Sequence, residues 1–508
     1  MGIYDFTFYD LIKRNAVTFG DKEAWYGVED ERSLTFSEYL EQVERLALGL
    51  REKDVKKGDR VGVLAKNSLE YFLLLGATAA LGAILVPISW RLSKEEVRYN
   101  LENCKPVVVF VDDENQAVIG DLRENLPFVK SCFSLERTEG GQYPPFSSLM
   151  EKSGDFSPPD VGAEDGLVII HTAAVAGKPR GALLSHANLL WADMHFDYLM
   201  NVTSKDVHLN FLPFFHVGGL FMTTAAFHAG ALNVQMKGFD AVRAVDIIRE
   251  KEASFTMVFT PILSSLLDEG EKKGVDISPL RAVTGIETPE TIERYQKASE
   301  GTFYSMYGQT ETSCLVSFGP YDERPGAAGR MLPMIDVRLV DEYDRPVARG
   351  EVGEITVKGP MVFKGYWGLP EETTHTFREG WHHTGDLGRF DDEGYLWYAG
   401  RSAEKELIKP GGENVYPAEV EKVILQHPAV EKTVVFGVPD PKWKEGIKAV
   451  CQLREGERLD AQELIDFVGE RIARYKKPSY VEFVRELPLL KDGSIDRAEV
   501  KKRYGGEQ

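Results

Sequence analysis

Two short motifs carry residue types suited to nucleotide binding. Tyr307-Gly-Gln-Thr-Glu311 combines an aromatic ring that can stack on a base, a hydroxyl for a phosphate and a carboxylate for Mg²⁺, which prefers oxygen ligands. Trp381-His-His-Thr-Gly-Asp-Leu387 places Asp386 in a turn, where its carboxylate could accept both ribose hydroxyls, as acidic residues do in dinucleotide-binding folds. Either motif alone is better explained as a core tyrosine or a turn aspartate.

A third segment, His171-Thr-Ala-Ala-Val-Ala-Gly-Lys-Pro-Arg-Gly181, is predicted to connect a strand to a helix. Gly177, Lys178 and Arg180 can offer backbone N–H groups and cations to a polyphosphate. The segment is not a Walker loop, because Pro179 follows the lysine at the position where Ser or Thr would hold magnesium. A loop of this composition is more often a plain connection.

The elements that must position these motifs begin with alternating strand and helix patterns. A strand at 60–65, a helix that Ser68 caps and that runs to Ala80, and a strand at 82–87 form one unit. This spacing makes a right-handed crossover in a largely parallel sheet. Ligands bind at the carboxyl ends of such strands. The later elements predicted in this half are strands at 106–111 and 165–171 and a helix from Ser185 onward.

The last third of the chain changes character. Residues 326–400 hold short β-rich pieces, such as 336–340 and 353–358, between Gly-rich turns, which predicts a small barrel or meander. A charged segment and the turn Pro410-Gly-Gly412 follow, so we place a domain boundary between Gly400 and Gly411. The elements predicted beyond it are a helix beginning at Pro417, strands near 432–438 and 447–453, and a helix near 460–474.

Composition narrows the class of protein. At about 150 residues per domain, 508 residues predict two to four domains. Sixty Lys and Arg against 80 Asp and Glu give a net charge of −20, which argues against a nucleic-acid or anionic-membrane binder. The N-terminus lacks a signal-peptide pattern, and the longest apolar run, 72–86, is shorter than the roughly 20 residues that span a bilayer. We therefore expect a soluble, cytoplasmic protein.

The four cysteines agree with that location. They lie far apart, with no C-x-x-C pair and no histidine at ligand spacing, which fits a reducing compartment and argues against a zinc site or a disulfide scaffold. They are Cys104, Cys132, Cys314 and Cys451.

In combination and in this order, the motifs resemble those of the AMP-forming acyl-CoA synthetases of the adenylate-forming superfamily. The resemblance extends from residues 34–38 to 496–497, nearly the whole chain. Its most specific segments are 307–311, 383–386, Gly411-Gly-Glu-Asn-Val-Tyr-Pro-Ala-Glu-Val-Glu421 and Gly437-Val-Pro-Asp440.

The resemblance implies an α/β fold with two domains. The N-terminal domain, 1–400, would hold two α/β subdomains with parallel-rich sheets plus a small β-barrel. Residues 401–410 would be a hinge, centred on Lys405 or Glu406, and 411–508 a small mobile α+β lid. Gly411, Gly412 and Glu413 would bind CoA, the two glycines letting the backbone approach its pantetheine closely.

The resemblance also implies a reaction in two steps. A carboxylate attacks the α-phosphate of ATP to give acyl-AMP and pyrophosphate, and the CoA thiol then displaces AMP to form a thioester, with Mg²⁺ neutralising phosphate charge. The partners implied are ATP, CoA and a small carboxylic acid of medium-chain, alicyclic or aromatic type. No nucleic acid is implied, the reaction could run in either direction, and homodimerisation is left open.

Roles follow by position. Thr310 would meet the α-phosphate, Glu311 the magnesium, and Asp386 and Arg401 the ribose, while His216 would sit between the acyl pocket and the nucleotide, its alternative being a packed core histidine. The catalytic candidates are His216, Thr310, Glu311, Lys405, Lys409 and Lys491. The nucleotide-binding candidates are Thr172, Gly177, Lys178, Arg180, Gly285, Ile286, Glu287, Tyr307, Gly308, Gln309, Thr310, Asp386 and Arg401.

Two positions depart from the family pattern. The phosphate loop normally reads Ser/Thr-Gly-Thr-Thr-Gly, whereas residues 173–177 read Ala-Ala-Val-Ala-Gly and lack its hydroxyls. Ser494 stands where the family has its adenylation lysine, and Lys405, Lys409 or Lys491 could replace that lysine. These departures keep two alternatives open: an acyl-adenylate passed to a carrier-protein thiol, and a non-catalytic sensor of nucleotide or acyl-CoA.

Overall fold

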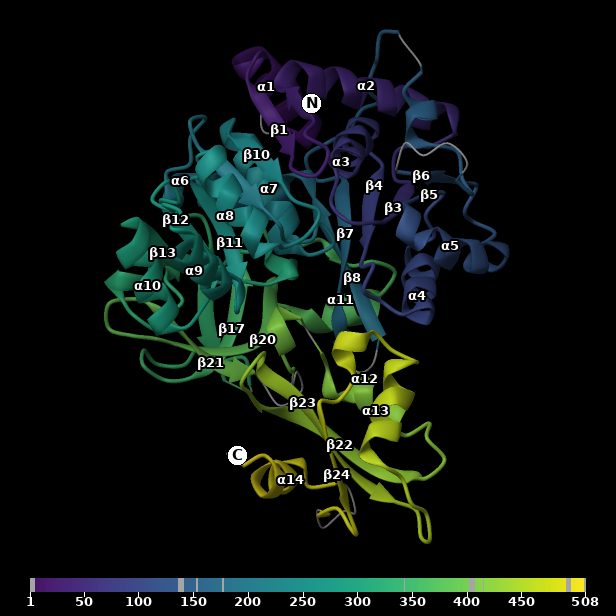
Figure 1. The fold of residues 1–508 in the computed structure, drawn as a ribbon, viewed down its shortest axis with the longest axis vertical. Coiled ribbons are helices and arrows are strands. Elements are labelled where there is room, and N and C mark those ends of the chain that lie inside the picture. Colours follow the sequence, from purple (N-terminus) through teal and green to yellow (C-terminus); the bar gives the residue numbers. More distant parts are fainter. Residues whose placement is uncertain are drawn as a thin grey trace.

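The computed structural model describes residues 5–135, 141–151, 154–175, 178–341, 343–401, 407–413, 415–489 and 495–506, and of residues 173–175 and 178 only the backbone. A large N-terminal part, residues 5–401, carries a smaller C-terminal part, residues 407–506, at one end (Figure 1). Within the described residues, no helix combines the length and apolar character needed to cross a membrane.

A seven-stranded sheet forms the first half of the N-terminal part, in the order β18-β8-β7-β4-β3-β5-β6. The strands β3, β4, β5 and β6 pair in parallel, as the crossover pattern predicts. Its strands are β3 (Arg60–Leu64), β4 (Ile84–Ile88), β5 (Val108–Val111), β6 (Ser131–Ser134), β7 (Gly166–Val175), β8 (Lys178–Ser185) and β18 (Gly365–Tyr366). The helices beside them are α3 (Leu69–Leu81), α4 (Lys94–Cys104) and α5 (Gln116–Leu122).

The predicted crossover is confirmed, and α3 is its centre. Ser68 caps the helix, because its side chain accepts a hydrogen bond from the backbone N–H of Tyr71, and Gly82 ends it in a left-handed conformation. Every residue of α3 is buried. Phe72 stacks on Trp25 at a ring-centroid distance of 5.3 Å, which ties the helix to the neighbouring sheet.

The prediction for residues 171–181 is wrong in one respect. The strand does not lead through a loop into a helix, because β7 pairs antiparallel with β8 and Thr172 faces Arg180 in that ladder. The residues after Gly181 continue as a strand because they also pair with β18 on the other side. The helix predicted from Ser185 is confirmed as α6 (His186–Met200), which Ser185 caps directly at the end of β8.

A nine-stranded sheet forms the second half of the N-terminal part, in the order β15-β14-β13-β12-β11-β9-β10-β1-β2. Its central strands are parallel, and β14 and β15 add to one edge as antiparallel strands. Its strands are β1 (Glu23–Gly27), β2 (Ser33–Thr35), β9 (Val207–Asn210), β10 (Leu232–Gln235), β11 (Phe255–Phe259), β12 (Ala282–Ile286), β13 (Thr302–Tyr307), β14 (Ser317–Pro320) and β15 (Arg330–Met331).

Seven helices pack around this second sheet or join it to the first. They are α1 (Phe8–Phe19), α2 (Phe36–Glu52), α6 (His186–Met200), α7 (Val217–Ala229), α8 (Ala241–Glu250), α9 (Ile262–Lys273) and α10 (Pro289–Ser299). Their apolar faces, together with α3 and strands of both sheets, form one continuous core.

The β-rich region predicted at 326–400 is a curled antiparallel sheet in the order β16-β17-β20-β19, with β21 paired to β20. Short helix α11 (Pro370–Thr376) precedes its edge. The strands are β16 (Asp336–Val340), β17 (Gly353–Lys358), β19 (Phe377–Arg378), β20 (Trp381–Phe390) and β21 (Leu396–Arg401).

The C-terminal part is α+β, as predicted. Its sheet has the order β22-β23-β24, with β22 (Val430–Asp440), β23 (Lys444–Leu453) and β24 (Tyr480–Val484). The helix predicted at Pro417 is α12 (Pro417–Ile424). The helix predicted near 460–474 is shorter, α13 (Ala461–Gly469), and a 3₁₀ turn over Arg474–Lys476 takes the rest. The chain continues to α14 (Arg497–Tyr504).

We predict that Ser68→Ala lowers the free energy of unfolding by about 1 kcal/mol, because the first turn of α3 loses its capping hydrogen bond. Urea denaturation followed by tryptophan fluorescence measures this, since Trp25 stacks on α3. Ser68→Thr keeps a hydroxyl cap and serves as the control. An equal effect of both substitutions would contradict the capping role.

Candidate active site

The carboxylate of Asp386 is the meeting point of the predicted ribose-binding residues. Tyr307 at the end of β13 donates its hydroxyl to Oδ2 at 2.8 Å, and the Gln309 side-chain amide donates to the same oxygen. Arg401 at the end of β21 lies 3.1 Å from Oδ1. Asp386 is only 2% exposed, and burial together with this carboxylate raises the pKa of Tyr307. Residues far apart in sequence are thus brought together.

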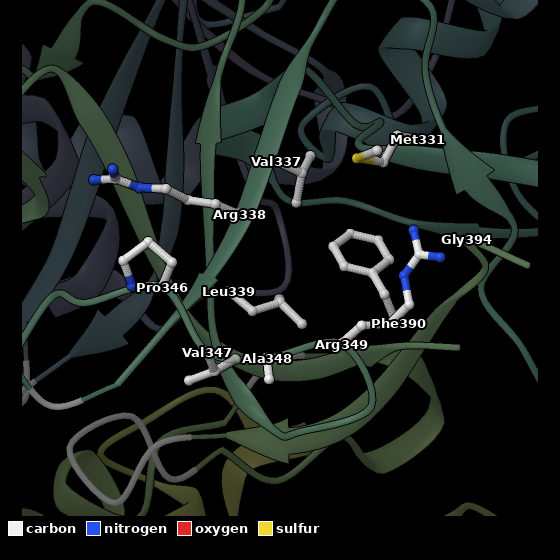
Figure 2. A pocket seen from close by; sticks show the side chains of 10 residues that line it. All are labelled: Met331, Val337, Arg338, Leu339, Pro346, Val347, Ala348, Arg349, Phe390 and Gly394. Carbon is white, nitrogen blue, oxygen red and sulfur yellow. The ribbon is translucent and has the colours of Figure 1, made fainter. Parts of the chain in front are cut away.

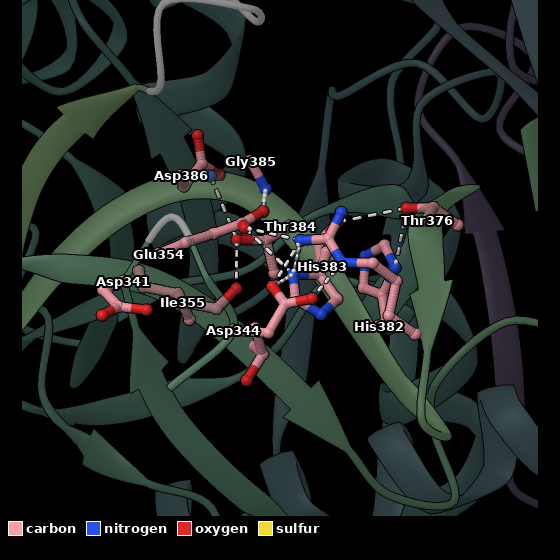
Figure 3. Close-up of polar contacts among 12 residues, drawn as sticks. Asp341, Asp344, Glu354, Ile355, Thr376, His382, His383, Thr384, Gly385 and Asp386 are labelled. Carbon is pink, nitrogen blue, oxygen red and sulfur yellow. Dashed lines mark hydrogen bonds and ion pairs between the residues drawn. The ribbon is translucent and has the colours of Figure 1, made fainter. Parts of the chain in front are cut away.

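Asp386 lies within strand β20 and not in the turn that its motif predicts, because it pairs with Arg401 of β21. Glu354 of the neighbouring strand β17 supports this segment of β20. Glu354 accepts hydrogen bonds from the backbone N–H of Gly385 at 2.8 Å and from the ring of His383 at 2.9 Å, as Figure 3 shows. Burial opposes ionisation of Glu354, yet these hydrogen bonds keep its pKa below the ordinary value. Gly385 has a φ of +67°, which favours glycine at this position.

Arg378 extends this support. Its guanidinium pairs with Asp344 at 2.9 Å and lies 3.3 Å from Glu354. The carboxylate of Glu354 is therefore held between a cation, a histidine and a backbone amide. The arrangement holds this segment of β20 in place and hence the position of Asp386.

Glu311, the predicted magnesium ligand, lies buried in a short 3₁₀ turn. The hydroxyl of Tyr366 donates to its Oε1 at 2.7 Å. The guanidinium carbon of Arg180 lies 4.2 Å from the centre of the Tyr366 ring, and its Nε has no hydrogen-bond partner among the described residues. Tyr366 thus joins the predicted metal ligand to a predicted phosphate ligand. The Thr172 hydroxyl is turned away from such a role, since it bonds the carbonyl of Arg180 at 3.3 Å.

Tyr416 and Lys409 of the C-terminal part both lie near Arg401. Burial raises the pKa of Tyr416 to about 12, and Arg401, Glu311 and Arg180 all lie near enough to act on its phenol. Lys409 keeps contact with solvent, yet the surrounding protein and then the nearby Arg401 charge lower the pKa of its ammonium. Both side chains therefore adjoin the predicted nucleotide site.

In the segment predicted to bind adenine, a ligand could approach the backbone closely at Gly285, and the side chain of Ile286 is apolar and exposed. Gly285 has a φ of +135°, and a Cβ there would lie 1.9 Å from the Val258 carbonyl oxygen. A Cβ on Gly308 would lie 1.9 Å from the Cys314 carbonyl oxygen. Ile286 is 50% exposed and could pack against a base. These positions admit no larger side chain without moving the strands.

Glu287, the last residue of the predicted adenine segment, follows directly after β12, and neighbouring groups hold its carboxylate by hydrogen bonds. Its Oε1 accepts hydrogen bonds from the Thr260 hydroxyl at 2.8 Å and the Thr288 backbone N–H at 3.1 Å. Lys444 of the C-terminal part lies 3.8 Å from the same oxygen. The adenine segment therefore touches both parts of the chain.

His216 occupies the N-cap position of α7, and its ring contacts Glu413, one of the predicted CoA-binding residues. Its Nε2 lies 3.2 Å from Glu413 Oε2, and because a carboxylate accepts, the ring donates. Glu413 also pairs with Arg91. The surrounding protein, followed by the Arg91 guanidinium, lowers the pKa of His216, although 44% of its side-chain surface stays accessible. The imidazole is therefore neutral at pH 7.

Gly411 and Gly412 lie beside this pair and also need small side chains. Both have positive φ, +58° and +86°. A Cβ on Gly411 would lie 2.8 Å from the Trp443 ring, and one on Gly412 would lie 3.4 Å from Phe259. The glycine backbone thus faces the N-terminal part next to His216, as a close approach of pantetheine requires.

Several predicted residues cannot be placed. Gly177, Lys405, Lys491 and Ser494 lie outside the described residues, as does the side chain of Lys178. Over the described ranges, no group of three or more His, Cys, Asp or Glu side chains is arranged to hold a metal ion. Mg²⁺ is usually held in proteins by one or two carboxylates together with waters and substrate phosphates.

Tyr366, Tyr416, Glu354 and Arg91 are among the residues of this arrangement that were not predicted. Tyr416 lies inside the 411–421 motif, so its position in the sequence was a usable signal. Tyr366, Glu354 and Arg91 come from strands and turns with no motif of their own, and only the fold brings them to the site.

A separate hollow of about 290 Å³ opens on the curled sheet (Figure 2). Val337, Leu339, Val347 and Phe390 line it. None of its lining residues belongs to the predicted site, so we do not assign it to the acyl group.

The comparisons with known proteins identify the class. A family model described as AMP-binding enzyme matches residues 12–367, and one described as AMP-binding enzyme C-terminal domain matches residues 419–493. The chain belongs to the AMP-binding enzyme family, and the resemblance to adenylate-forming enzymes is confirmed.

Particular relatives add detail. Indoleacetate–CoA ligase of Aromatoleum aromaticum is 36% identical over 479 residues, which is 93% of either chain. Feruloyl-CoA synthase of an Amycolatopsis species is 32% identical over 93% of this chain and 94% of its own. The solved structure of o-succinylbenzoate CoA synthetase from Bacillus subtilis, a double mutant with a product analogue, is 26% identical with a TM-score of 0.86 and covers 98% of this chain and 99% of its own.

We predict that Glu354→Gln weakens ATP binding at least about tenfold, equivalent to ~1.4 kcal/mol, because the amide presents an NH₂ group to Arg378 where the carboxylate accepted. Isothermal titration calorimetry with ATP measures the affinity. Glu351→Gln is the matched control, since Glu351 lies exposed three residues earlier and bonds only its own turn at Ala348. Equal affinities of the two variants would contradict the positioning role of Glu354.

Proposed function

We propose that the protein is an AMP-forming acyl-CoA ligase, which activates a carboxylic acid with ATP and transfers the acyl group to CoA. One observation carries the proposal. The Asp386 cluster and Glu311 lie in the N-terminal part, and the segment from Lys409 to Tyr416 of the C-terminal part adjoins them. This neighbourhood supports the proposal that the nucleotide would bind at Asp386 and Glu311, and that the CoA thiol would approach along Gly411 and Gly412 beside His216. The named CoA ligases among the relatives support the same reaction.

In the first step, Asp386 and Arg401 would hold the ribose, and Tyr307 and Ile286 the adenine. Thr310 would donate its hydroxyl to the α-phosphate. With the nucleotide held in line with the incoming carboxylate, positioning and charge stabilisation supply most of the catalysis expected for attack at phosphorus.

Magnesium fits the donor set at Glu311. One carboxylate oxygen already accepts from Tyr366, which leaves the other free to ligate beside phosphate oxygens. When bound there, the ion would neutralise charge on the phosphates. Arg180, held against Tyr366, would face the outer phosphates in place of the hydroxyls that residues 173–177 lack.

In the second step, the CoA thiol would reach the acyl-adenylate along Gly411 and Gly412. His216 is neutral and donates to Glu413, so its ring is held in one orientation beside that path. We assign His216 the task of separating the acyl group from the nucleotide rather than that of a base. The hinge between the two steps would lie at Lys405 or Glu406.

Lys409 is the best-supported substitute for the lysine missing at 494. It lies near Arg401 and Asp386, where the ribose and the α-phosphate would meet. Its cation could bridge the incoming carboxylate and the α-phosphate, as the family lysine is expected to do. Lys405 and Lys491 remain alternatives.

The names of the relatives point to aromatic acids first. Indoleacetate and ferulate both carry an aromatic ring, and a fatty acid or an alicyclic acid would be the next candidates. Transfer to a carrier protein and a purely sensing role are not favoured. The cytoplasmic location and a homodimeric assembly stay predictions.

We predict that the purified protein forms acyl-CoA and AMP from ATP, Mg²⁺, CoA and at least one acid of a panel containing indoleacetate, ferulate, a medium-chain fatty acid and an alicyclic acid. Mass spectrometry detects both products, and acyl-CoA with AMP and pyrophosphate tests the reverse reaction. Loading of a phosphopantetheinylated carrier with CoA inert would favour carrier transfer. Nucleotide binding with no turnover in either direction would contradict the ligase and favour a sensor.

We predict that Lys409→Met slows acyl-adenylate formation by about 100-fold, because a positioned charge is lost. The cation exists below its lowered pKa and is lost as pH rises through it, so the wild-type rate should fall on the alkaline side at lower pH than the rate of Lys409→Arg, which stays charged. Pyrophosphate release without CoA measures this step.

Lys422→Met is the control, since Lys422 is an exposed lysine of α12 outside the proposed site. A normal rate in Lys409→Met would move the role to Lys405 or Lys491.

A further inference from the structure

A buried lysine is shared by the two parts of the chain. Lys476, in the 3₁₀ turn of the C-terminal part, donates to Glu419 Oε2 at 2.9 Å within that part and to Glu96 Oε1 of helix α4 at 2.6 Å. Its side chain is 3% exposed, and the two carboxylates are 15% and 9% exposed. An ion pair this deeply buried is stable only if its geometry is good and its oxygens are hydrogen-bonded.

The carboxylate of Glu96 is held in place from both sides. Its Oε2 accepts from the backbone N–H and hydroxyl of Ser93 at 2.8 and 2.7 Å, as part of the capping box of α4. The same oxygen accepts the backbone N–H of Ala473 at 3.1 Å. Glu96 thus presents one oxygen to a lysine and the other to a backbone amide of the C-terminal part, which fixes orientation as well as distance.

Glu419 continues the connection toward the active site. Its second oxygen accepts the backbone N–H of Tyr416 at 3.0 Å. Tyr416 faces Arg401 and Glu311. A rigid series of contacts therefore runs from Glu96 through Lys476 and Glu419 to a residue at the nucleotide site.

The same stretch of the N-terminal part holds a second contact. Arg91, five residues before Glu96, pairs with Glu413, which accepts from His216. The far end of the C-terminal part, with β24 and α14, points away from the N-terminal part in Figure 1. In this orientation the Gly411–Glu413 backbone is turned to the site.

We propose that Glu96 is a positioning residue for the thioester-forming step: by docking Lys476 and the Ala473 backbone, it holds the C-terminal part where Gly411 and Gly412 meet His216. The inference rests on the proposed ligase function and names a residue that contacts no substrate. When the contact between Glu96 and Lys476 is broken, Lys476 still pairs with Glu419, so the C-terminal part retains its internal ion pair. Acyl-adenylate formation is expected to depend less on this contact, because Thr310, Asp386 and Arg401 lie in the N-terminal part and Lys409 lies in the predicted hinge segment, close to Arg401.

Glu96→Gln tests the contact between Glu96 and the C-terminal part while keeping an acceptor for Ser93. Glu95→Gln is the matched control, because Glu95 pairs with Arg98 on the exposed side of α4. Two rates are measured: pyrophosphate release without CoA, and CoA-dependent consumption of preformed acyl-adenylate. We expect Glu96→Gln to slow the second rate about 10- to 100-fold, the scale of a small misplacement, and to leave the first within about twofold. Glu95→Gln should change neither.

Hydrogen–deuterium exchange reports the dock without any activity. The peptide containing Ala473 should exchange faster in Glu96→Gln than in wild type or Glu95→Gln, while a peptide from α14 should not change. An equal loss in both half-reactions, an unchanged thioester rate, or unchanged exchange at Ala473 would overturn the proposal. A wild-type chain that forms no thioester would instead overturn the ligase function and the role in that step, with the exchange data still reporting the dock.

Discussion

The proposed nucleotide site depends on the burial of the Asp386 carboxylate. A carboxylate that is 2% exposed is stable only if its oxygens are paired, and the partners come from β13, the turn after it, and β21. The nine-stranded sheet and the curled sheet must therefore meet at this point. An apolar cluster that includes Tyr307, Ile355 and Leu396 fills the space behind it, so packing and charge set the same geometry.

The two parts of the chain meet through polar contacts of a different kind. Pairs such as Arg91 with Glu413, Lys476 with Glu96, and Lys444 with Glu287 join them in the described structure. The partly exposed pairs, Arg91 with Glu413 and Lys444 with Glu287, can be exchanged for water at a lower cost than a large apolar interface, whereas the buried pair of Lys476 and Glu96 is costlier to break. Relative motion of the two parts is the default expectation for an interface of this kind. Which of these ion pairs form then determines which face of the C-terminal part is turned to the proposed nucleotide site.

The sequence was sufficient wherever the signal was local. The crossover with its Ser68 cap and the helix starting at Pro417 follow from capping and turn chemistry. The hairpin at 171–185 was missed because its second strand is stabilised by β18, nearly 200 residues away. The same holds for the site: motifs predicted Tyr307 and Asp386, whereas Glu354 and Tyr366 act only through contacts that the fold creates.

Residues 173–177 lack the hydroxyls that the family pattern places at the phosphates. In the proposed site, other groups would therefore have to stabilise the phosphate charge. A hydroxyl acts at one distance and one direction, whereas a cation acts over a longer range and with less directional preference. Arg180, backed by the Tyr366 ring, and Lys409, beside Arg401, offer charge of the second kind. Attraction of this type stabilises bound ATP and bound pyrophosphate to a similar degree, and uniform stabilisation does not favour one direction. In the proposed mechanism, replacing hydroxyls by cations would therefore be compatible with reaction in either direction.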